Sequence, residues 1–202
     1  MFLHHFFDDV HKTLEYSDRV LAVSRERDAA TGLAWGMSLH GWALGATGRV
    51  DDGVAELRDG LARQRAAGSE IGRPQFDWML GDIYLRAGRY EEAADAVTDG
   101  LDTAAKTGDH YWDGELNRLN GEIAIRSGRP SDDADRYFLV ALADARARDA
   151  KSFELRAATS LARLWQAQGR RHDAQQLLRP VYDWFTEGLD TADLIAARSL
   201  LD

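Results

Sequence analysis

Apolar residues recur at helical spacing along most of the chain, in segments of about 16 to 18 residues separated by short turns. In the segment 33–47 the apolar positions follow this spacing up to Gly48, a residue type that commonly ends a helix in the left-handed conformation. No segment shows the alternation of apolar and polar residues, bounded by hairpin turns, that indicates β-strands. The pattern therefore predicts an all-α protein.

The helical segments form a repeat with a period of about 40 residues. Four of the five Gly-Arg dipeptides follow one another at intervals of 40 or 41 residues, a small residue stands seven positions before each of these four glycines, and a further series of glycines and aspartates falls between them. These series are Gly48, Gly88, Gly128 and Gly169; Gly41, Gly81, Gly121 and Ala162; and Asp28, Gly68, Gly108, Asp149 and Gly188. A glycine inside a helix costs about 1 kcal/mol relative to alanine, so its recurrence at one register indicates that two helices approach closely there.

The repeat predicts a single domain made of pairs of antiparallel helices. We expect a partial repeat at 1–28, four repeats at 29–68, 69–108, 109–149 and 150–188, and a capping helix within 189–202. Pro180 is expected to kink or break the last paired helix, because proline has no N–H group to donate. The residues expected to face inward from the capping helix are Leu194, Ile195, Ala197 and Leu200, and those expected to serve as packing residues before it are Trp165, Trp184 and Phe185.

Two stretches of the second repeat resemble the tetratricopeptide repeat (TPR). Leu80-Gly81 is followed by Tyr84, and then by Tyr90-Glu91-Glu92-Ala93. The small residues on the first helix and the alanine on the second are typical of that family, although its usual period is about 34 residues. The resemblance implies an α-α superhelix, a TPR-like solenoid with a C-terminal capping helix.

Four further stretches resemble the C-terminal TPR region of bacterial regulators, in which a class III adenylate or guanylate cyclase or a DNA-binding domain precedes an ATPase module. They are Gly41-Trp42-Ala43-Leu44, Leu119-Asn120-Gly121-Glu122, Leu161-Ala162-Arg163-Leu164-Trp165 and the stretch 180–191. The sequence contains no Gly-Lys pair and hence no P-loop. The resemblance implies interaction and regulation rather than cyclase activity.

Composition and charge narrow the class of protein. The 202 residues are 45% hydrophobic and 29% charged, which is apolar enough to bury a core, and the absence of cysteine excludes disulfides and thiol chemistry. The formal net charge of −9 disfavours nucleic acid and anionic membranes as partners, and no apolar run is long enough to span a bilayer. The N-terminal sequence turns acidic at once, unlike a signal peptide, so we expect a soluble, cytoplasmic protein.

An N-terminal cluster of histidines and aspartates contains pairs at helical spacing, which could hold a divalent metal ion. The cluster is His4, His5, Asp8, Asp9 and His11. An apolar stripe on the same segment favours an end helix that packs on the first repeat, so we predict no metal and no cofactor. Acidic pairs such as Asp51-Asp52 stand at helix starts, where the helix dipole favours them, and we predict no catalytic residue and no enzyme activity.

The first helix of each repeat carries the strongest binding signal. In TPR arrays these helices line the concave groove, and the resemblance places aromatic and charged side chains there. The predicted partner-binding residues are Trp35, Trp42, Trp78, Asp82, Arg86, Arg118, Arg156 and Arg163. Aromatic and arginine side chains suit an extended peptide that carries carboxylates. The alternative is that pairs such as Asp82 with Arg86 satisfy each other and that the tryptophans pack between repeats.

We therefore predict a non-catalytic scaffold that binds a protein or peptide segment in its concave groove. One alternative is a sensory or regulatory TPR domain that binds a small ligand and gates a cyclase, an ATPase or a transcription regulator. Another is a homo-oligomer formed through the N-terminal end, where the apolar stripe has an incomplete partner.

Overall fold

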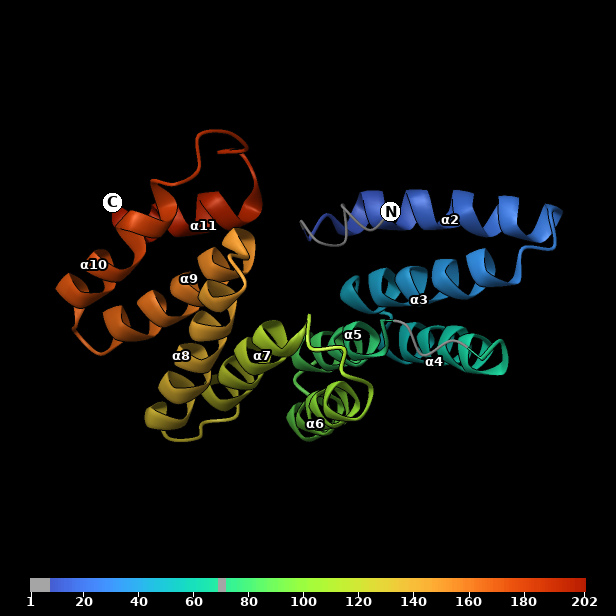
Figure 1. The fold of residues 1–202 in the computed structure, drawn as a ribbon, viewed down its shortest axis with the longest axis horizontal. Coiled ribbons are helices and arrows are strands. Elements are labelled where there is room, and N and C mark those ends of the chain that lie inside the picture. Colours follow the sequence, from blue (N-terminus) through green and yellow to red (C-terminus); the bar gives the residue numbers. More distant parts are fainter. Residues whose placement is uncertain (1–7, 69–71) are drawn as a thin grey trace. The chain divides into compact units, whose positions relative to one another are not determined.

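The computed structural model describes residues 8–68 and 72–202, and within these ranges the chain forms ten α-helices and no strand (Figure 1). The predicted all-α class is confirmed. The helices are α2 (Val10–Glu26), α3 (Ala30–Ala46), α4 (Val50–Ala66), α5 (Arg73–Arg86), α6 (Tyr90–Thr107), α7 (Asp113–Arg126), α8 (Ser131–Ala147), α9 (Lys151–Ala167), α10 (Arg171–Tyr182) and α11 (Ala192–Leu201). None of these described helices is both long and apolar enough to cross a bilayer.

The chain turns at the residues that the sequence marks. Every member of the Gly-Arg series and of the glycine and aspartate series has a positive φ, from +50° at Asp28 to +95° at Gly48. Glycine adopts this left-handed conformation without a steric penalty, and aspartate is among the few other residues that tolerate it. All of them except Gly188 lie one or two residues after the end of a helix, so those helices end at a locally encoded stop.

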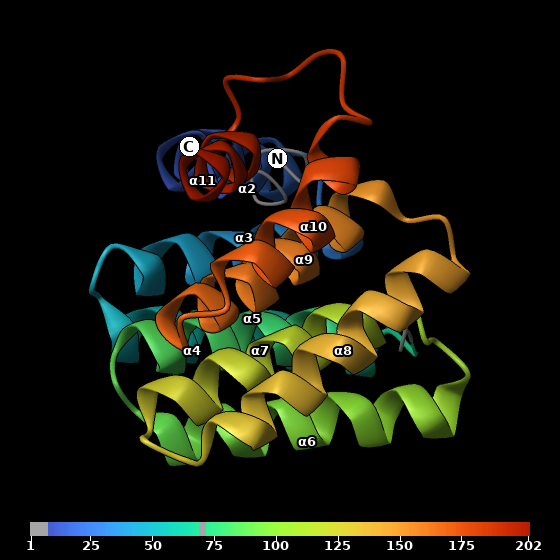
Figure 2. The same ribbon diagram turned by 90° about the vertical axis from the view of Figure 1, so that its left-hand side faces the viewer.

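The helices fall into two compact units, Met1–His110 and Tyr111–Asp202. In the first unit, α3 packs against α2, α4 and α5, while α5 also packs against α4 and α6. In the second unit, α9 packs against α7, α8 and α10, and α11 lies on α9 and α10 (Figure 2). The expected repeat boundaries and the expectation of a single domain stay predictions.

The small residues on the first helices mark close contacts with the second helices. A Cβ atom added to Gly41 would lie 2.6 Å from both the carbonyl oxygen of Gly53 and the backbone nitrogen of Leu57 in α4. A Cβ atom added to Gly121 would overlap the ring of Phe138 in α8. Leu57 and Phe138 stand 16 and 17 residues after their glycines, at corresponding points of their repeats, so the two contacts are equivalent.

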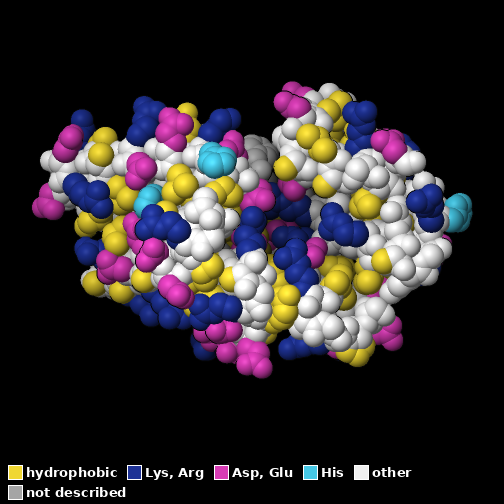
Figure 3. Space-filling view, turned by 180° about the vertical axis from the view of Figure 1, so that it is seen from behind, with side chains coloured by type: hydrophobic (Ala, Val, Ile, Leu, Met, Phe, Trp, Pro, Cys, Tyr) yellow, Lys and Arg dark blue, Asp and Glu magenta, His cyan; other side chains and the backbone are white. Residues whose placement is uncertain are grey.

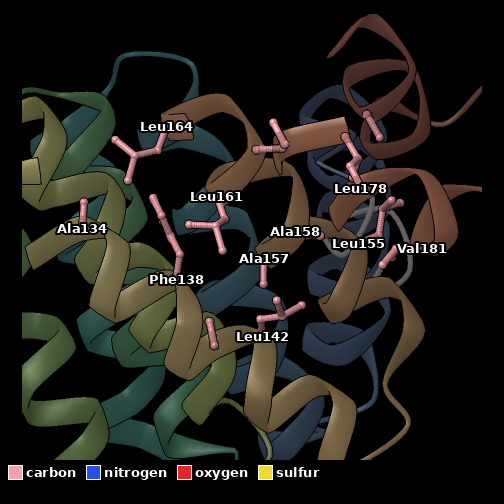
Figure 4. Close-up of a cluster of buried hydrophobic side chains, with 14 of the residues drawn as sticks. Ala134, Phe138, Leu142, Leu155, Ala157, Ala158, Leu161, Leu164, Leu178 and Val181 are labelled. Carbon is pink, nitrogen blue, oxygen red and sulfur yellow. The ribbon is translucent and has the colours of Figure 1, made fainter. Parts of the chain in front are cut away.

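The core of the second unit is shared by α8, α9, α10 and α11. Figure 4 shows Phe138 of α8 beside Leu161 of α9, and Leu178 of α10 beside Leu155 of α9. Phe138, Leu161 and Leu178 are fully buried. Burial of such side chains stabilises the fold by about 1.5 to 3 kcal/mol each, so the unit is held together chiefly by these contacts between helices.

The C-terminal segment differs from its prediction in two places. Helix α10 contains Pro180 and has 12 residues, against 17 in α4 and α8, so the chain leaves the helix before Trp184. Trp184 is 59% exposed and is not the packing residue that the sequence suggested. In α11 the buried residues are Leu194, Ala197 and Leu201, whereas Ile195 is exposed, because the stripe that faces α9 and α10 follows i, i+3, i+7 spacing from Leu194.

Candidate partner-binding face

The eight predicted partner-binding residues lie on α3 and α5 in the first unit and on α7 and α9 in the second. We call the side of these helices that carries them the A-helix face. In each unit, side chains at the same position of successive repeats contact each other on this face.

In the first unit, Trp42 is the centre of the A-helix face. Its side chain is fully buried, and its Nε1 donates a hydrogen bond of 2.9 Å to Oδ2 of Asp82. Nε of Arg86 donates to the same oxygen at 2.9 Å, and the guanidinium lies 5.8 Å from the Trp42 ring centroid. Asp82 is thus held between an indole donor from α3 and a guanidinium on its own helix α5.

Arg86 also joins the start of the chain's described part to α5. Its Nη2 donates a 2.7 Å hydrogen bond to Oδ1 of Asp8, directly before α2. Burial by itself lowers the pKa of Arg86, but Asp82 and Asp8 outweigh it, so the pKa is raised. The guanidinium therefore stays charged and bridges two carboxylates.

The three tryptophans predicted to line the groove are more buried than side chains that contact a partner need to be. Trp78 is 6% exposed, and half-buried Trp35 packs against Phe76 with ring centroids 4.8 Å apart. Helix α3 has neighbours on three sides, which covers most of its circumference. Trp42 and Trp78 therefore pack among the helices, as in the alternative that the sequence left open, and a role for them in partner binding stays a prediction.

In the second unit, Glu115 is the most buried charged group on the A-helix face, with 1% exposure. Arg118 binds it with both ends of the guanidinium, at 2.9 and 3.0 Å, and Nη1 of Arg156 lies 3.5 Å from Oε2. Burial raises the pKa of Glu115, but the two guanidinium groups lower it by more, so its pKa lies below the usual range. Arg118 and Arg156 thus hold α7 and α9 together.

Glu122 lies two helical turns beyond Glu115 on α7. Its Oε1 accepts a 2.8 Å hydrogen bond from Oγ of Ser160, and guanidinium nitrogens of Arg118 and Arg163 each lie 3.8 Å from it. Arg163 has an exposed fraction of 55% for its side chain, against 16% for Arg118 and 11% for Arg156. Among the predicted arginines of this unit, Arg163 is the most exposed.

These contacts share a rule that the sequence prediction missed. Trp42 contacts Asp82, Glu115 contacts Arg156, and Glu122 contacts Arg163, and the members of each pair are 40 or 41 residues apart. Charge pairs within one helix follow from i, i+4 spacing, whereas these contacts join the same position in neighbouring repeats. Complementary residue types at one repeat position are the signal that could have found them.

The lowered pKa of Glu115 predicts how acid acts on the second unit. Its ionised form stabilises the fold above its unfolded-state pKa, and this stabilisation is lost as pH falls through the lower folded-state pKa. Glu115→Gln should cost about 1 to 3 kcal/mol at pH 7, and the difference from the wild type should shrink below about pH 4. Urea unfolding followed by circular dichroism at several pH values measures this.

A matched control is Glu15→Gln, since the side chain of Glu15 is 63% exposed and lies 3.9 Å from Arg19. It should change the unfolding free energy by less than about 1 kcal/mol at any pH. A Glu115→Gln deficit that stays constant down to pH 3 would contradict the assigned role of the buried carboxylate.

The N-terminal metal candidate is only partly described. His4 and His5 lie outside the described residues. Asp8 contacts Arg86, and Asp9 caps α2 by accepting a 3.1 Å hydrogen bond from the backbone nitrogen of Lys12. Across residues 8–68 and 72–202, no cluster of three or more His, Asp or Glu side chains is arranged to hold a metal ion.

Charges of both signs lie side by side on the surface that Figure 3 shows. A shallow hollow of about 390 Å³ runs along α8, on the side of this helix that carries exposed Leu139 and Val140. Its lining comes from one helix, whereas small-molecule sites usually gather polar groups from several elements. The hollow therefore gives no specific support to the small-ligand alternative.

Comparison with solved structures identifies the fold of this chain. No protein-family model and no curated protein sequence matches this chain. Among solved structures, BtubC (BKLC) from P. vanneervenii is similar with a TM-score of 0.70 and 17% identity, over 100% of this chain and 82% of that one. A kinesin light chain-like protein of Podosopora anserina with nearly identical TPR-like repeats is similar in two crystal structures, with TM-scores of 0.58 and 0.56, 20% identity and 88% of this chain covered, over 88% and 89% of those chains. The fold is that of a TPR-like helical repeat protein.

Proposed function

We propose that this chain is a non-catalytic scaffold that binds an acidic segment of a partner protein on its A-helix faces. TPR-like repeat neighbours suggest a protein-interaction scaffold, and such folds are typically non-catalytic. Solenoids bury a continuous core and leave the faces of their helices to vary, so binding chemistry resides in exposed side chains.

The exposure of the Arg163 side chain supports this proposal most directly. This side chain is more than half exposed, and its Nη1 lies 3.8 Å from Oε1 of Glu122, which is already hydrogen-bonded to Ser160. An exposed ion pair of this kind contributes at most about 1 kcal/mol, so a partner's carboxylate can replace Glu122 at small cost. Arg86 offers a second, half-buried guanidinium in the first unit.

The buried members of the predicted set have a supporting role in this proposal. Trp42, Asp82 and Arg156 contact residues on neighbouring helices and fix the spacing of these helices, and Arg118 holds Glu115 in place on its own helix. Changing them is expected to alter stability first. The contact residues we propose are therefore Arg163, Arg86 and the exposed part of Trp35.

A displayed library of random peptides, selected on the immobilised chain, tests the proposal. We expect enrichment of Asp- and Glu-containing peptides, and Arg163→Ala should weaken the selected peptides roughly tenfold, the loss of about one charge-assisted hydrogen bond. Arg136→Ala is the control, because Arg136 is also exposed and lies 3.6 Å from a carboxylate, but on α8.

Two results would overturn this function. One is a library that yields no acidic consensus. The other is a set of acidic peptides whose affinity falls equally with Arg163→Ala and Arg136→Ala, since that would indicate attraction to any exposed positive charge. Calorimetry on purified variants distinguishes these outcomes from loss of folding.

The finer sequence-based hypotheses stay predictions. These are membership of a cyclase- or ATPase-containing regulator, sensing of a small ligand, a cytoplasmic location and self-association through the N-terminal end. The apolar stripe on which the last one depends is only partly described, because Phe2, Leu3, Phe6 and Phe7 lie outside the described residues, whereas Val10 and Leu14 are half-buried residues of α2.

A further inference from the structure

Helix α11 occupies the place that the first helix of a fifth repeat would take. It packs against α9 and α10, the two preceding helices of the fold, as α9 packs against α7 and α8, although its contact with α10 is less extensive than that of α9 with α8. Its start lies 41 residues after the start of α9, which is one repeat length. The surface beneath α11 on α9 and α10, which we call the helix slot, is therefore built to receive a helix.

Polar groups at the two ends of the helix slot recognise the two ends of its occupant. At one end, Nε of Arg156 donates a 2.8 Å hydrogen bond to Asp193, in the first turn of α11. At the other end, Gln166 and Arg179 donate to the carbonyl oxygens of Leu200 and Leu201, at 2.6 and 3.3 Å. These carbonyls belong to the last turn of α11, which has no later backbone N–H groups within the helix to bond them.

The apolar surface of the helix slot, on α9 and α10, determines which apolar pattern a bound helix must have. Leu194, Ala197 and Leu201 are the buried residues of α11, and they join one cluster with side chains of α9 and α10. Leu155, Leu178 and Val181 of this cluster lie near one another in Figure 4. The central position is an alanine with no exposed surface, so the backbone of the occupant runs close to the floor there. The slot thus selects for an acidic first turn followed by large, small and large apolar residues at i, i+3 and i+7.

Few side chains hold α11 in the helix slot. Ten residues form α11, and three of them are buried. The segment 183–191 that ties it to α10 is non-helical, and its Trp184 and Leu189 are 59% and 45% exposed. Nine residues reach the slot of the same chain easily, so a second copy gains nothing by exchanging α11, whereas a partner helix of higher affinity can displace it.

We propose that the helix slot is a second binding site, for a short amphipathic helix of a partner protein that carries a carboxylate in its first turn, and that α11 competes for it. The proposal extends the scaffold function to another surface. It does not use Arg163, so the two proposals fail separately.

A fluorescent synthetic peptide of residues 189–202 is the probe, and anisotropy with the full-length chain is the measurement. Asp193→Asn in the chain loosens the resident helix and leaves the slot itself intact. We expect the peptide to bind this variant at least about tenfold more tightly than the wild type, in which α11 competes from the same chain. Arg198→Ala is the matched control, because Arg198 lies in α11 but is 67% exposed and should leave peptide binding unchanged.

A second peptide tests the recognition of charge. The peptide with Asp193→Asn should bind the loosened chain about tenfold more weakly than the unmodified peptide, through loss of its contact with Arg156. Equal binding of the two peptides, or equal peptide affinity of the wild-type and Asp193→Asn chains, would overturn the proposal. So would dimerisation of the Asp193→Asn chain in light scattering, which would make a second copy the occupant. Leu194→Ala in the chain repeats the loosening without touching a charge, and circular dichroism verifies that each variant is folded.

Discussion

Replacing Trp42 with alanine is expected to lower the free energy of unfolding of the first unit by about 3 to 5 kcal/mol. The indole is fully buried, so its removal leaves a large cavity between α3 and α5. It also removes the Nε1 donor from Asp82, which is 7% exposed and accepts from Arg86 on the same oxygen. Urea denaturation followed by far-ultraviolet circular dichroism measures the loss.

Trp184→Ala is the matched control for this substitution. It removes the same side chain from a site that is 59% exposed and should change stability by about 0.5 kcal/mol or less. Trp42→Phe separates the two causes, because it restores ring volume and leaves Asp82 without the indole donor, at a cost of about 1 to 3 kcal/mol. If the Trp42→Ala protein is as stable as the Trp184→Ala protein, the packing role that we assign to Trp42 is wrong.

Gly41→Ala should destabilise the first unit by about 3 kcal/mol, although alanine is the better helix former. The new methyl group would lie 2.6 Å from the Gly53 carbonyl oxygen and from the Leu57 nitrogen, which are backbone atoms of α4 that cannot rotate away. The two helices would have to separate, and the buried side chains around them would lose contact. Thermal and urea unfolding of the purified variant measure the effect.

Gly32→Ala is the comparison that isolates this cause. It lies on the same helix, and its new methyl group would meet Oγ of Ser24, a side chain that can change rotamer. We expect Gly32→Ala to be close to neutral or slightly stabilising, since helix propensity favours alanine by about 1 kcal/mol. If both variants lose the same stability, close approach at Gly41 is not what the repeating glycine provides.

The helical fold could be predicted because the residues that start and end its helices act through local backbone preferences. Gly48 and Asp28 end helices through their own backbone preferences, and Pro130 and Pro74 stand at helix starts, where a missing N–H group costs nothing. Each of these signals acts within a few residues, so one sequence without relatives is enough to find them.

The exposure of the candidate site could not be predicted in the same way. The position after the small residue is fully buried at Trp42 and more than half exposed at Arg163, although the repeat places both at the same register. What differs is which neighbouring helix covers the position, and helical spacing alone does not specify that. Ile195 illustrates the same limit, since one step of 100° around α11 separates it from buried Leu194.

The polar contacts were missed for a related reason. Glu115 lies three residues from Arg118 and 41 from Arg156, and it contacts both. The first contact follows from helix geometry, whereas the second requires two repeats to stack in register. Only a comparison of residue types across the stack would have suggested it.

Residues in the left-handed conformation recur at the helix ends, and this regularity affects how the number of repeats can change during evolution. Because each reversal is specified by one or two residues, a two-helix module can be duplicated or deleted between two such junctions without altering the signals in the remaining modules. Length can thus evolve in whole modules, while the surface chemistry of each one diverges independently.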